Sequence, residues 1–207
     1  MPHDYYLKVD GSMSQFIEIK VIPASELTQI DLQSIQDLCT RAYGEDVWCD
    51  YEYLKAAYHV VGRDAGVIVS HALWVNRSLS VNGAAPLMTA YVEYVATEPA
   101  LQGLGLASQL LRFLLNYIQN QVAIHAELDV ALPYQLAALA PAESQFYERL
   151  GWELWQGDLY IRQQDDLQHD HLIPTPDDDV MIFRLTTTPE ISITDDLSAE
   201  WREGELW

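Results

Sequence analysis

Residues 90–120, AYVEYVATEPALQGLGLASQLLRFLLNYIQN, decide the fold class of this chain. The segment opens with an apolar, aromatic and β-branched run, Tyr91 to Ala96, which predicts a buried strand interrupted by one acid, Glu93. That strand ends at Glu98-Pro99, where a turn spaced by glycines follows. Apolar residues then recur at positions 107, 110, 111, 114 and 118 with polar residues opposite, which predicts an amphipathic helix. The segment is therefore a strand, a glycine turn and a helix.

The glycine turn, Gln102 to Ala107, predicts a site for an anionic group. Gly103 and Gly105 allow a ligand to approach the backbone closely, and the first amides of the following helix attract phosphate. The turn is not a P-loop, because no Gly-Lys-Ser/Thr follows, and the wider GxGxxG spacing of dinucleotide sites is absent. Taken without other motifs, the glycine pair would also fit an ordinary turn between a strand and a helix.

Two motifs resemble those of the GCN5-related N-acetyltransferases (GNAT family). Gln102 to Ala107 resembles the family's Q/R-x-x-G-x-G/A pyrophosphate loop, and Glu143 to Trp152 resembles its A-x-x-F-Y-x-x-x-G-F/W helix and turn. The resemblance implies an α/β fold, with a mixed, mostly antiparallel central sheet flanked by helices, in one domain over residues 16–207. It also implies acetyl-CoA as cofactor, held by the strand edge and the loop at Val95, Ala96, Thr97, Gln102, Gly103, Leu104, Gly105, Leu106 and Ala107.

Composition bounds the partners that the protein can have. The chain has 207 residues, of which 49% are hydrophobic and 20% charged, as expected of a globular protein. Its net charge of -20 argues against nucleic acid or an anionic membrane and favours a cationic small molecule, although acidic surfaces also serve solubility. No window predicts a leader or a membrane span, so we expect a cytoplasmic protein in which Cys39 and Cys49 are reduced. No metal is predicted, because no cluster has the spacing of metal ligands.

The first half of the chain predicts alternating elements. After a flexible segment over residues 1–15, a strand is predicted at 16–22 and then a helix from an N-cap at Ser25 to Tyr43-Gly44. The apolar face of this helix is expected to comprise Leu27, Ile30, Ile35, Leu38, Cys39 and Ala42. A second helical pattern ends at Tyr58, and strands are predicted at 60–61, 67–75 and on both sides of the Asn82-Gly83 hairpin turn. His71 lies inside a strand and is interpreted as structural.

In the second half of the chain, two segments are candidates for the same strand. Residues 122–130 alternate with period two, and residues 134–140 form a short apolar run. The family pattern favours the second run, which would make the first an insertion. Further strands are predicted at 159–162 and 180–185. The last 50 residues hold 13 acids but three arginines and end on tryptophan, so the acidic tail, residues 187–207, is expected to fold back onto the domain.

The chain resembles one GNAT subfamily more closely, the aminoglycoside 2'-N-acetyltransferases, from about Phe16 onward. The resemblance rests on Tyr-Val-Glu-x-Val-Ala at 91–96, Tyr-Gln-Leu-x-Ala-Leu at 134–139, Leu-Gly-Trp ahead of Trp155-x-Gly157, Thr-Pro-Asp-Asp-Asp at 175–179 and Trp-Arg-x-Gly-acid-x-Trp at 201–207. Three positions depart from the subfamily pattern. Tyr94 replaces a glycine, Ala140 replaces a serine, and Glu205 replaces an aspartate.

The closer resemblance implies an acetyl transfer with named residue roles. Glu93 would act as general base through water, and Tyr147 as general acid toward the departing CoA sulfur. An alkylammonium must lose a proton before it attacks a thioester, and a carboxylate can accept that proton. The drug's amino groups would meet Asp46, Asp50, Glu93, Tyr94, Asp178, Asp179, Glu205 and the α-carboxylate of Trp207. The resemblance also implies a homodimer, for which the sequence shows no interface.

Each role has a structural alternative. Glu93 could be a buried acid paired with an arginine, Tyr147 a packing aromatic, Asp50 a helix N-cap, and Asp177 to Asp179 an ordinary turn. Three functions follow from the same residues. The first is an acetyltransferase acting on aminoglycosides, the second is one acting on a polyamine, a peptide or a small metabolite amine, and the third is a non-catalytic acyl-CoA-binding module whose acidic face docks a basic partner.

Overall fold

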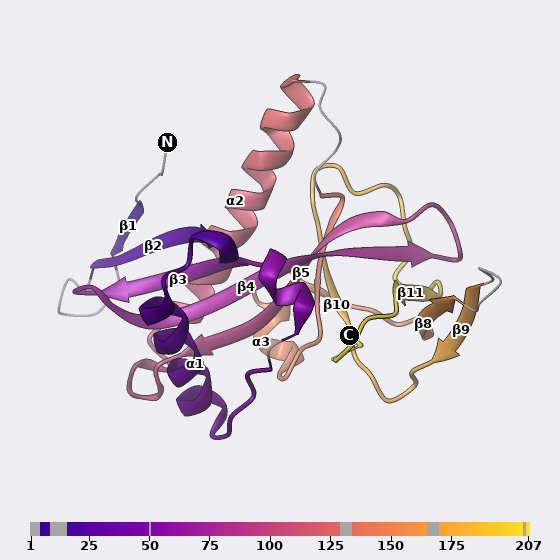
Figure 1. The fold of residues 1–207 in the computed structure, drawn as a ribbon. Helices are drawn as coiled ribbons and strands as arrows, with labels where there is room; N and C mark the ends of the chain where they lie inside the picture. The colour runs from indigo at the N-terminus through magenta and orange to yellow at the C-terminus, as the bar shows by residue number, and fades with distance from the viewer. Residues whose placement is uncertain (1–4, 9–15, 50, 129–133, 165–169, 205) are drawn as a thin grey trace. The chain divides into compact units, whose positions relative to one another are not determined.

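A computed structural model describes residues 5–8, 16–49, 51–128, 134–164, 170–204 and 206–207 (Figure 1). The chain divides into two compact units. Unit 1 comprises Met1–Val75 and Val92–Asn116, and unit 2 comprises Asn76–Tyr91 and Tyr117–Trp207. The long strands β4 (Val67–Val81) and β5 (Leu87–Thr97) contribute residues to both units. The predicted fold class is confirmed, because the sheet is mixed, mostly antiparallel and accompanied by few helices.

Unit 1 carries the N-terminal part of the sheet. Besides segments of β4 and β5, its strands are β1 (Tyr5–Lys8), β2 (Phe16–Pro23) and β3 (Tyr58–Asp64). Neighbours from β1 to β4 pair antiparallel. The prediction of a flexible segment over residues 1–15 was wrong for β1, which pairs with β2 and sets Tyr5 opposite Ile19. The backbone of β2 offers that edge, and the alternation in so short a run was too weak to reveal the partner.

Helix α1 (Gln29–Tyr43) begins later than the sequence predicted. Its N-cap is Thr28, whose Oγ1 accepts a hydrogen bond from the Asp31 amide at 3.1 Å, and not Ser25. Ser25 lies in a separate 3-10 turn, η1 (Ala24–Glu26). The Ala24 amide of this turn donates a hydrogen bond to the Ala57 carbonyl at 2.8 Å. The predicted end is confirmed, because Gly44 caps the helix with φ +81°.

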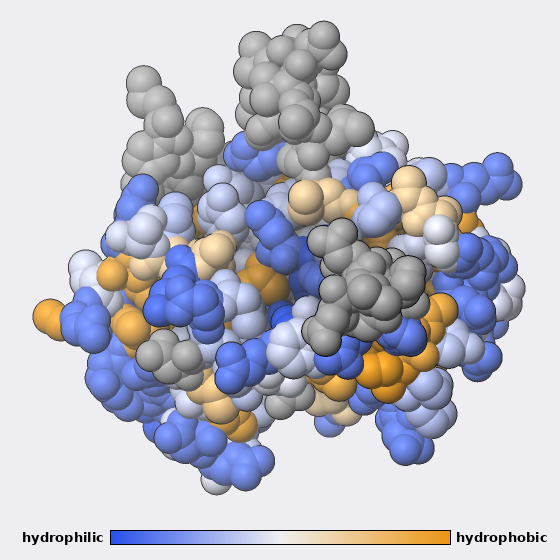
Figure 2. All heavy atoms as spheres, turned by 45° about the vertical axis from the view of Figure 1, so that its right-hand side comes forward, coloured by the Kyte–Doolittle hydropathy of each residue, from blue (hydrophilic) through white to orange (hydrophobic). Residues whose placement is uncertain are grey.

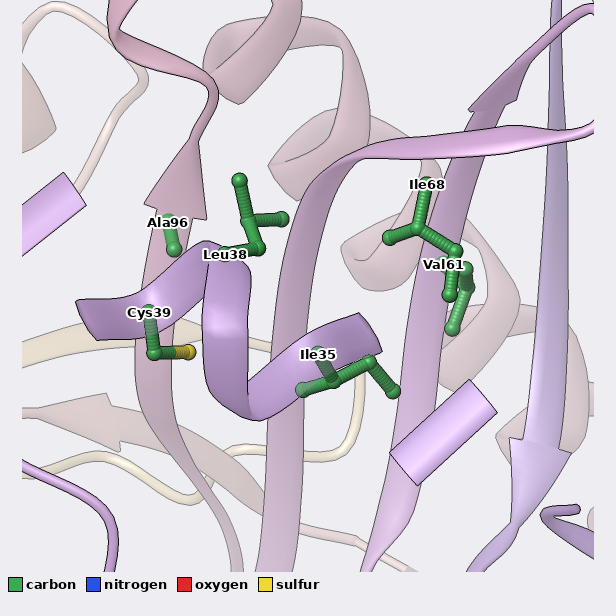
Figure 3. Close-up of a cluster of buried hydrophobic side chains, with 6 residues drawn as sticks. All are labelled: Ile35, Leu38, Cys39, Val61, Ile68 and Ala96. Carbon is green, nitrogen blue, oxygen red and sulfur yellow. The ribbon is translucent and has the colours of Figure 1, made fainter. Parts of the chain in front are cut away.

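The inner face of α1 packs on the unit 1 sheet. Figure 3 shows the resulting cluster of buried side chains, which comprises Ile35, Leu38, Cys39, Val61, Ile68 and Ala96. Ile30 was predicted on this face but is 79% exposed, since the helix begins one residue before it and turns it outward. The rest of the predicted face is confirmed, since Ile35, Leu38 and Cys39 belong to the cluster and Leu27 and Ala42 pack against it.

Helix α2 (Leu106–Leu128) approaches the other face of the same strands. A Cβ placed on Gly62 would lie 3.4 Å from Leu110 of α2 and 3.3 Å from Ile17, whereas the adjacent Val61 belongs to the α1 cluster. Because neighbouring strand residues face opposite sides, α1 and α2 cover opposite faces of β3. The helix also runs further than predicted. Residues 122–128 continue α2, so the interpretation of 122–130 as an insertion was wrong for those residues, and 129–130 lie outside the described part.

Two short 3-10 turns complete unit 1. The pattern that predicted a second helix through Tyr58 forms only η2 (Glu52–Ala56), because Tyr58 already begins β3. The flanking residue of η2 is Tyr51, and Asp50, interpreted alternatively as its cap, lies outside the described residues. The second turn, η3 (Pro99–Leu101), follows β5.

Unit 2 holds the rest of the sheet. Its further elements are β6 (Leu136–Leu139), α3 (Ser144–Glu148), β7 (Glu153–Leu154), β8 (Leu159–Gln164), β9 (Asp170–Pro174), β10 (Met181–Arg184) and β11 (Leu197–Glu200). Strand β6 pairs parallel with β5, and β10 pairs antiparallel with β6 and β7. The choice of residues 134–140 for the open strand is confirmed by β6, and β8 and β10 confirm the two late strands. The Asn82-Gly83 turn is confirmed as well, with φ of +49° and +67°.

The acidic tail folds back within unit 2, as predicted. Trp207 is buried, and β11 pairs parallel with β8 and antiparallel with β4. Gly157 of the Trp155-x-Gly157 motif lets the tail pass, because a Cβ there would lie 1.9 Å from the carbonyl oxygen of Asp195. The Trp155 indole donates to that same oxygen at 2.7 Å. The motif is therefore a docking point for the tail.

Candidate functional site

The glycine turn forms an open backbone loop after β5. Gly103 and Gly105 have φ of +77° and +82°, a conformation that favours glycine, and no atom lies within 4 Å of where a Cβ would stand on either. Gln102 fastens the loop to the strand, because its Nε2 donates to the Thr97 carbonyl at 3.2 Å. The loop and the end of β5, predicted separately as parts of a cofactor site, are thus brought together in unit 1.

The loop leads directly into the N-terminus of α2. Gln109 donates to the Gly105 carbonyl at 3.0 Å, which begins the helical hydrogen bonding. The amides of Leu106, Ala107 and Ser108 precede that bond, at the end of the helix where amides lack intrahelical acceptors and the helix dipole is positive. Chemically, the arrangement suits a phosphate or pyrophosphate group.

Strand β5 changes its backbone direction just before this loop. Tyr94 has φ +51°, a left-handed conformation that is uncommon for a bulky residue, at the position where the resemblance expects glycine. Its carbonyl oxygen accepts a hydrogen bond from His71 Nδ1 at 3.0 Å, and the next carbonyl, of Val95, accepts from the Tyr43 hydroxyl at 3.1 Å. The distortion is therefore held by side chains from β4 and α1.

The hydrogen bond to Tyr94 fixes the protonation of a buried histidine pair. A carbonyl can only accept, so His71 carries its proton on Nδ1 and leaves Nε2 as an acceptor. His59 Nδ1 lies 3.0 Å from that Nε2 and must donate to it. Burial lowers the pKa of His59 to about 4 and that of His71 to about 3, so both rings are neutral at pH 7. This confirms that His71 is structural.

Three of the predicted acceptor residues gather in unit 1. Glu93 accepts a hydrogen bond from the Tyr53 hydroxyl at 3.2 Å. The adjacent Tyr94 ring lies 4.7 Å from the ring of Trp48, whose amide donates to Asp46 Oδ1 at 3.2 Å. A carboxylate and an aromatic wall therefore share one neighbourhood, in which burial raises the pKa of Tyr94 to about 12. Residues 45–53, EDVWCDYEY, are rich in acids and aromatics, but the sequence gives no role to Trp48 or Tyr53.

Tyr147 lies in unit 2, on α3. It is 8% exposed and makes edge contacts with the rings of Phe146 and Trp152, at centroid distances of 4.9 and 6.2 Å. Burial, with a smaller contribution from the charge of Glu143, raises its pKa to about 12. Its phenol is therefore protonated across the physiological range.

The remaining acceptor predictions fall in unit 2. Asp177 to Asp179 are exposed in a turn that the Asp178 amide closes on the Thr175 carbonyl at 3.2 Å. The indole of Trp207 donates to Thr175 Oγ1 at 2.8 Å, so the end of the chain and this acidic turn lie together. Asp50 and Glu205 lie outside the described residues.

Comparison with known proteins now places the chain. A family model described as an acetyltransferase (GNAT) domain matches residues 24–155. The chain belongs to the GNAT acetyltransferase family. Among curated relatives, an aminoglycoside 2'-N-acetyltransferase from Mycolicibacterium fortuitum is 27% identical over 195 residues, which cover 91% of each chain.

Solved GNAT structures share the fold at lower identity. The GNAT family N-acetyltransferase YhbS from Escherichia coli, solved in complex with CoA, matches with a TM-score of 0.59 at 18% identity over 93% of each chain. A GCN5-related N-acetyltransferase from Kribbella flavida matches 68% of this chain at 17% identity with a TM-score of 0.50, but this chain spans only 34% of its length. Among the described residues, no helix is both long and apolar enough to cross a membrane.

As a GNAT acetyltransferase, the protein uses acetyl-CoA, and unit 1 fits that cofactor. The open glycine loop and the first amides of α2 suit its pyrophosphate. Thr97 adds a polar atom, since its buried Oγ1 meets no hydrogen-bond partner within the described part of the chain. The carbonyls of Val95 and Thr97 already accept hydrogen bonds from Tyr43 and Gln102, which fix this end of β5 beside the loop.

Proposed function

We propose that this acetyltransferase acetylates the 2'-amine of an aminoglycoside or a similar amino sugar. One observation carries the proposal: the last residue is folded against the acidic turn of unit 2 by the hydrogen bond from Trp207 to Thr175. This contact supports a role for Trp207, with Asp178 and Asp179, in binding a multiply charged amine. Each close charge pair contributes roughly 1 to 4 kcal/mol before desolvation is counted. The relative from M. fortuitum supports the same acceptor class.

Glu93 is the group that we assign to deprotonation of the amine. Its carboxylate accepts from the Tyr53 hydroxyl, which orients it while leaving further lone pairs for a water or an ammonium. The adjoining Trp48 and Tyr94 rings present apolar faces that stabilise a cation and limit bulk water. Glu93 therefore receives the proton directly or through a water, after which the amine can attack.

Bound acetyl-CoA supplies the acetyl thioester and a thiolate leaving group. Tyr147 was predicted to protonate that leaving group, and its raised pKa refines the role. A phenol of pKa about 12 is a weaker acid than a thiol of pKa roughly 8.5, so full transfer of its proton is unfavourable. We therefore assign Tyr147 to donate a hydrogen bond from Oη, which stabilises the developing negative charge without completing the transfer.

A second acceptor class is favoured by one observation. The Tyr94 ring stands where the resemblance expects glycine, and with Trp48 it forms an aromatic wall that packs against the α1 cluster. Burial raises the pKa of Tyr94, and the charge of the neighbouring Glu93 contributes to the same rise. Such a wall narrows the space for a bulky amino sugar and suits a slender polyamine or a small metabolite amine. Both acceptor classes use the same chemistry at Glu93 and differ only in the shape of the amine.

A panel of amines separates the two classes. Thiol release is followed with tobramycin, gentamicin, kasugamycin and spermidine at saturating acetyl-CoA, and we expect the highest kcat/KM with an aminoglycoside. Preference for spermidine would transfer the proposal to the second class, and no release with any amine would overturn both. Glu93→Gln, which keeps the shape of the side chain, is expected to lower kcat about 100-fold or more with little change in acetyl-CoA affinity.

The cysteines bear on the cellular location, and the family resemblance bears on the assembly. Both cysteines are free thiols, Cys39 buried and Cys49 exposed, which is usual for a reducing compartment and supports a cytoplasmic protein. The homodimer implied by the family resemblance stays a prediction, which sedimentation equilibrium would test.

A further inference from the structure

Arg77 on β4 is a buried arginine whose partners come from the tail. Its side chain is 1% exposed. Nη1 donates to the Leu206 carbonyl at 2.7 Å, Nη2 donates to the Glu200 carbonyl at 2.8 Å, and Nε lies 3.4 Å from Glu200 Oε1. All three groups lie at least 120 residues along the chain from Arg77. A single guanidinium therefore binds the tail at two points, Glu200 at the end of β11 and Leu206.

We call the hydrogen bonds from Arg77 to Glu200 and Leu206 the clamp. The surroundings of Arg77 show that this clamp is built around a positive charge. Its Cζ lies 4.9 Å from the centroid of the Tyr91 ring, a cation–π distance. Glu200 also accepts from the Ser78 amide at 2.9 Å, so its carboxylate is fixed beside the guanidinium. A buried charge is costly unless it is paired and hydrogen-bonded, and here the tail provides the pairing. Release of the tail would thus expose or orphan this charge.

The position of the clamp bears on the last residue. The carbonyl of Leu206 is held by Arg77, and the side chain of Trp207 is held by Thr175. Because the backbone before Trp207 and the ring of Trp207 are both held, this residue has little orientational freedom. We propose that Arg77 is a positioning residue that holds Trp207 in place beside the acidic turn for recognition of the amine. The recognition step rests on the proposed function, whereas the clamp itself does not.

Arg162 provides a matched comparison in the same unit. Its Nη1 donates to the carbonyl and hydroxyl of Ser198 at 2.7 and 2.8 Å, and its Nη2 donates to the Ser78 carbonyl at 2.7 Å. It therefore binds the tail at Ser198 of β11, whereas Arg77 binds it at Glu200 and again at Leu206. Lysine cannot reproduce a planar fork, so Arg77→Lys and Arg162→Lys each lose a similar hydrogen-bond geometry, but only the first loosens Leu206.

Carboxypeptidase A, which removes aromatic C-terminal residues, tests the clamp without any assumption about the substrate. Trp207 release from the full-length protein is measured for wild type, Arg77→Lys, Arg162→Lys and Thr175→Val. We expect release to be about tenfold faster in Arg77→Lys and Thr175→Val than in wild type, and near the wild-type rate in Arg162→Lys. Equal rates in Arg77→Lys and wild type, or equal acceleration in both arginine variants, would overturn the clamp.

Steady-state kinetics test the consequence for the amine. In Arg77→Lys, KM for the preferred amine is expected to rise about tenfold, while KM for acetyl-CoA changes less than twofold and the melting temperature shows that the protein is folded. Faster Trp207 release with an unchanged amine KM would overturn the positioning role. Thr175→Val leaves the buried residues of β4 unchanged. It must also raise KM for the amine while KM for acetyl-CoA changes little. If wild type acetylates no aminoglycoside, the proposed acceptor fails, but the carboxypeptidase rates still decide the clamp.

Discussion

Tyr94 combines a strained backbone with a well-packed ring. Its φ of +51° costs an L-residue roughly 1 to 2 kcal/mol relative to glycine, while its ring contact with Trp48 at 4.7 Å returns a similar amount. The hydrogen bond from His71 to its carbonyl holds the strained conformation. Strain of this kind persists where surrounding contacts determine the backbone, often at functional sites.

Replacement of Tyr94 by glycine is the first test at this scale. Relieved strain offsets only part of the lost ring contact and of the lost burial of the ring, so we expect Tyr94→Gly to lower the free energy of unfolding by about 1 to 3 kcal/mol, by urea titration. Removal of the ring should also raise kcat/KM for bulky aminoglycosides relative to spermidine. A loss of more than about 3 kcal/mol, or an unchanged amine preference, would contradict the account.

The His59–His71 pair makes stability depend on pH. Both pKa values are lowered, to about 4 and about 3, so the unfolded chain binds protons that the folded protein does not when the pH falls below about 6.5. Their contribution is complete above pH 6.5 and is lost as the pH falls toward the folded pKa values. Between pH 6 and 5 the expected slope approaches about 1.4 kcal/mol per pH unit for each histidine.

Urea unfolding at pH 7, 6 and 5 measures this slope. His71→Gln removes one titrating ring, and its amide can still donate to the Tyr94 carbonyl. Its stability should therefore depend on pH less steeply than that of wild type over this interval. Equal slopes in the two proteins would show that the pair does not carry the effect.

Two glycines lie where chain segments pack closely, one against a side chain and the other against backbone. Gly62 on β3 lets α2 approach the sheet, and a Cβ there would meet the Ser70 hydroxyl at 2.2 Å. Gly157 lets the tail pass, and a Cβ there would meet backbone atoms of Asp195. A side-chain hydroxyl can rotate away, whereas a backbone carbonyl cannot move without shifting its segment.

The two glycines therefore form a matched pair of variants. Gly62→Ala is expected to lower the free energy of unfolding by about 1 kcal/mol and Gly157→Ala by more than about 3 kcal/mol, because only the second displaces backbone. Urea titration of both proteins gives the comparison. A larger loss for Gly62→Ala than for Gly157→Ala would contradict this assignment of the contacts.

Elements with strong local signals were predictable, and those set by distant contacts were not. The Asn82-Gly83 turn and the end of α1 at Gly44 follow from local residue chemistry, whereas the strand over 134–140 was selected by the family resemblance. The start of α1 depended on whether Ser25 or Thr28 reached a free amide, which the sequence leaves open. The alternation of residues 122–130 suggested a strand or an insertion, but residues up to 128 continue the helix already nucleated at Leu106.

At the scale of the whole molecule, the excess of acids has a functional interpretation. Hydrophilic side chains cover most of the coloured surface in Figure 2, in keeping with a net charge of -20. In unit 1, Glu93 is joined to Tyr53 and the glycine loop is joined to the end of β5. In unit 2, Trp207 lies against the acidic turn at Thr175, whereas Tyr147 packs against Phe146 and Trp152. The sequence identified these groups through motifs. It could not reveal Arg77 or Tyr53, because a buried arginine and one tyrosine among many carry no pattern.

Removal of Leu206 and Trp207 separates binding of the amine from binding of acetyl-CoA, because it deletes the residues held by Arg77 and Thr175 and leaves the glycine loop of unit 1 untouched. Steady-state thiol release gives KM for tobramycin and for acetyl-CoA in the full-length and shortened proteins. For the shortened protein we expect KM for tobramycin to rise at least about tenfold, while KM for acetyl-CoA changes less than twofold. An unchanged KM for tobramycin in a folded, active shortened protein would contradict it.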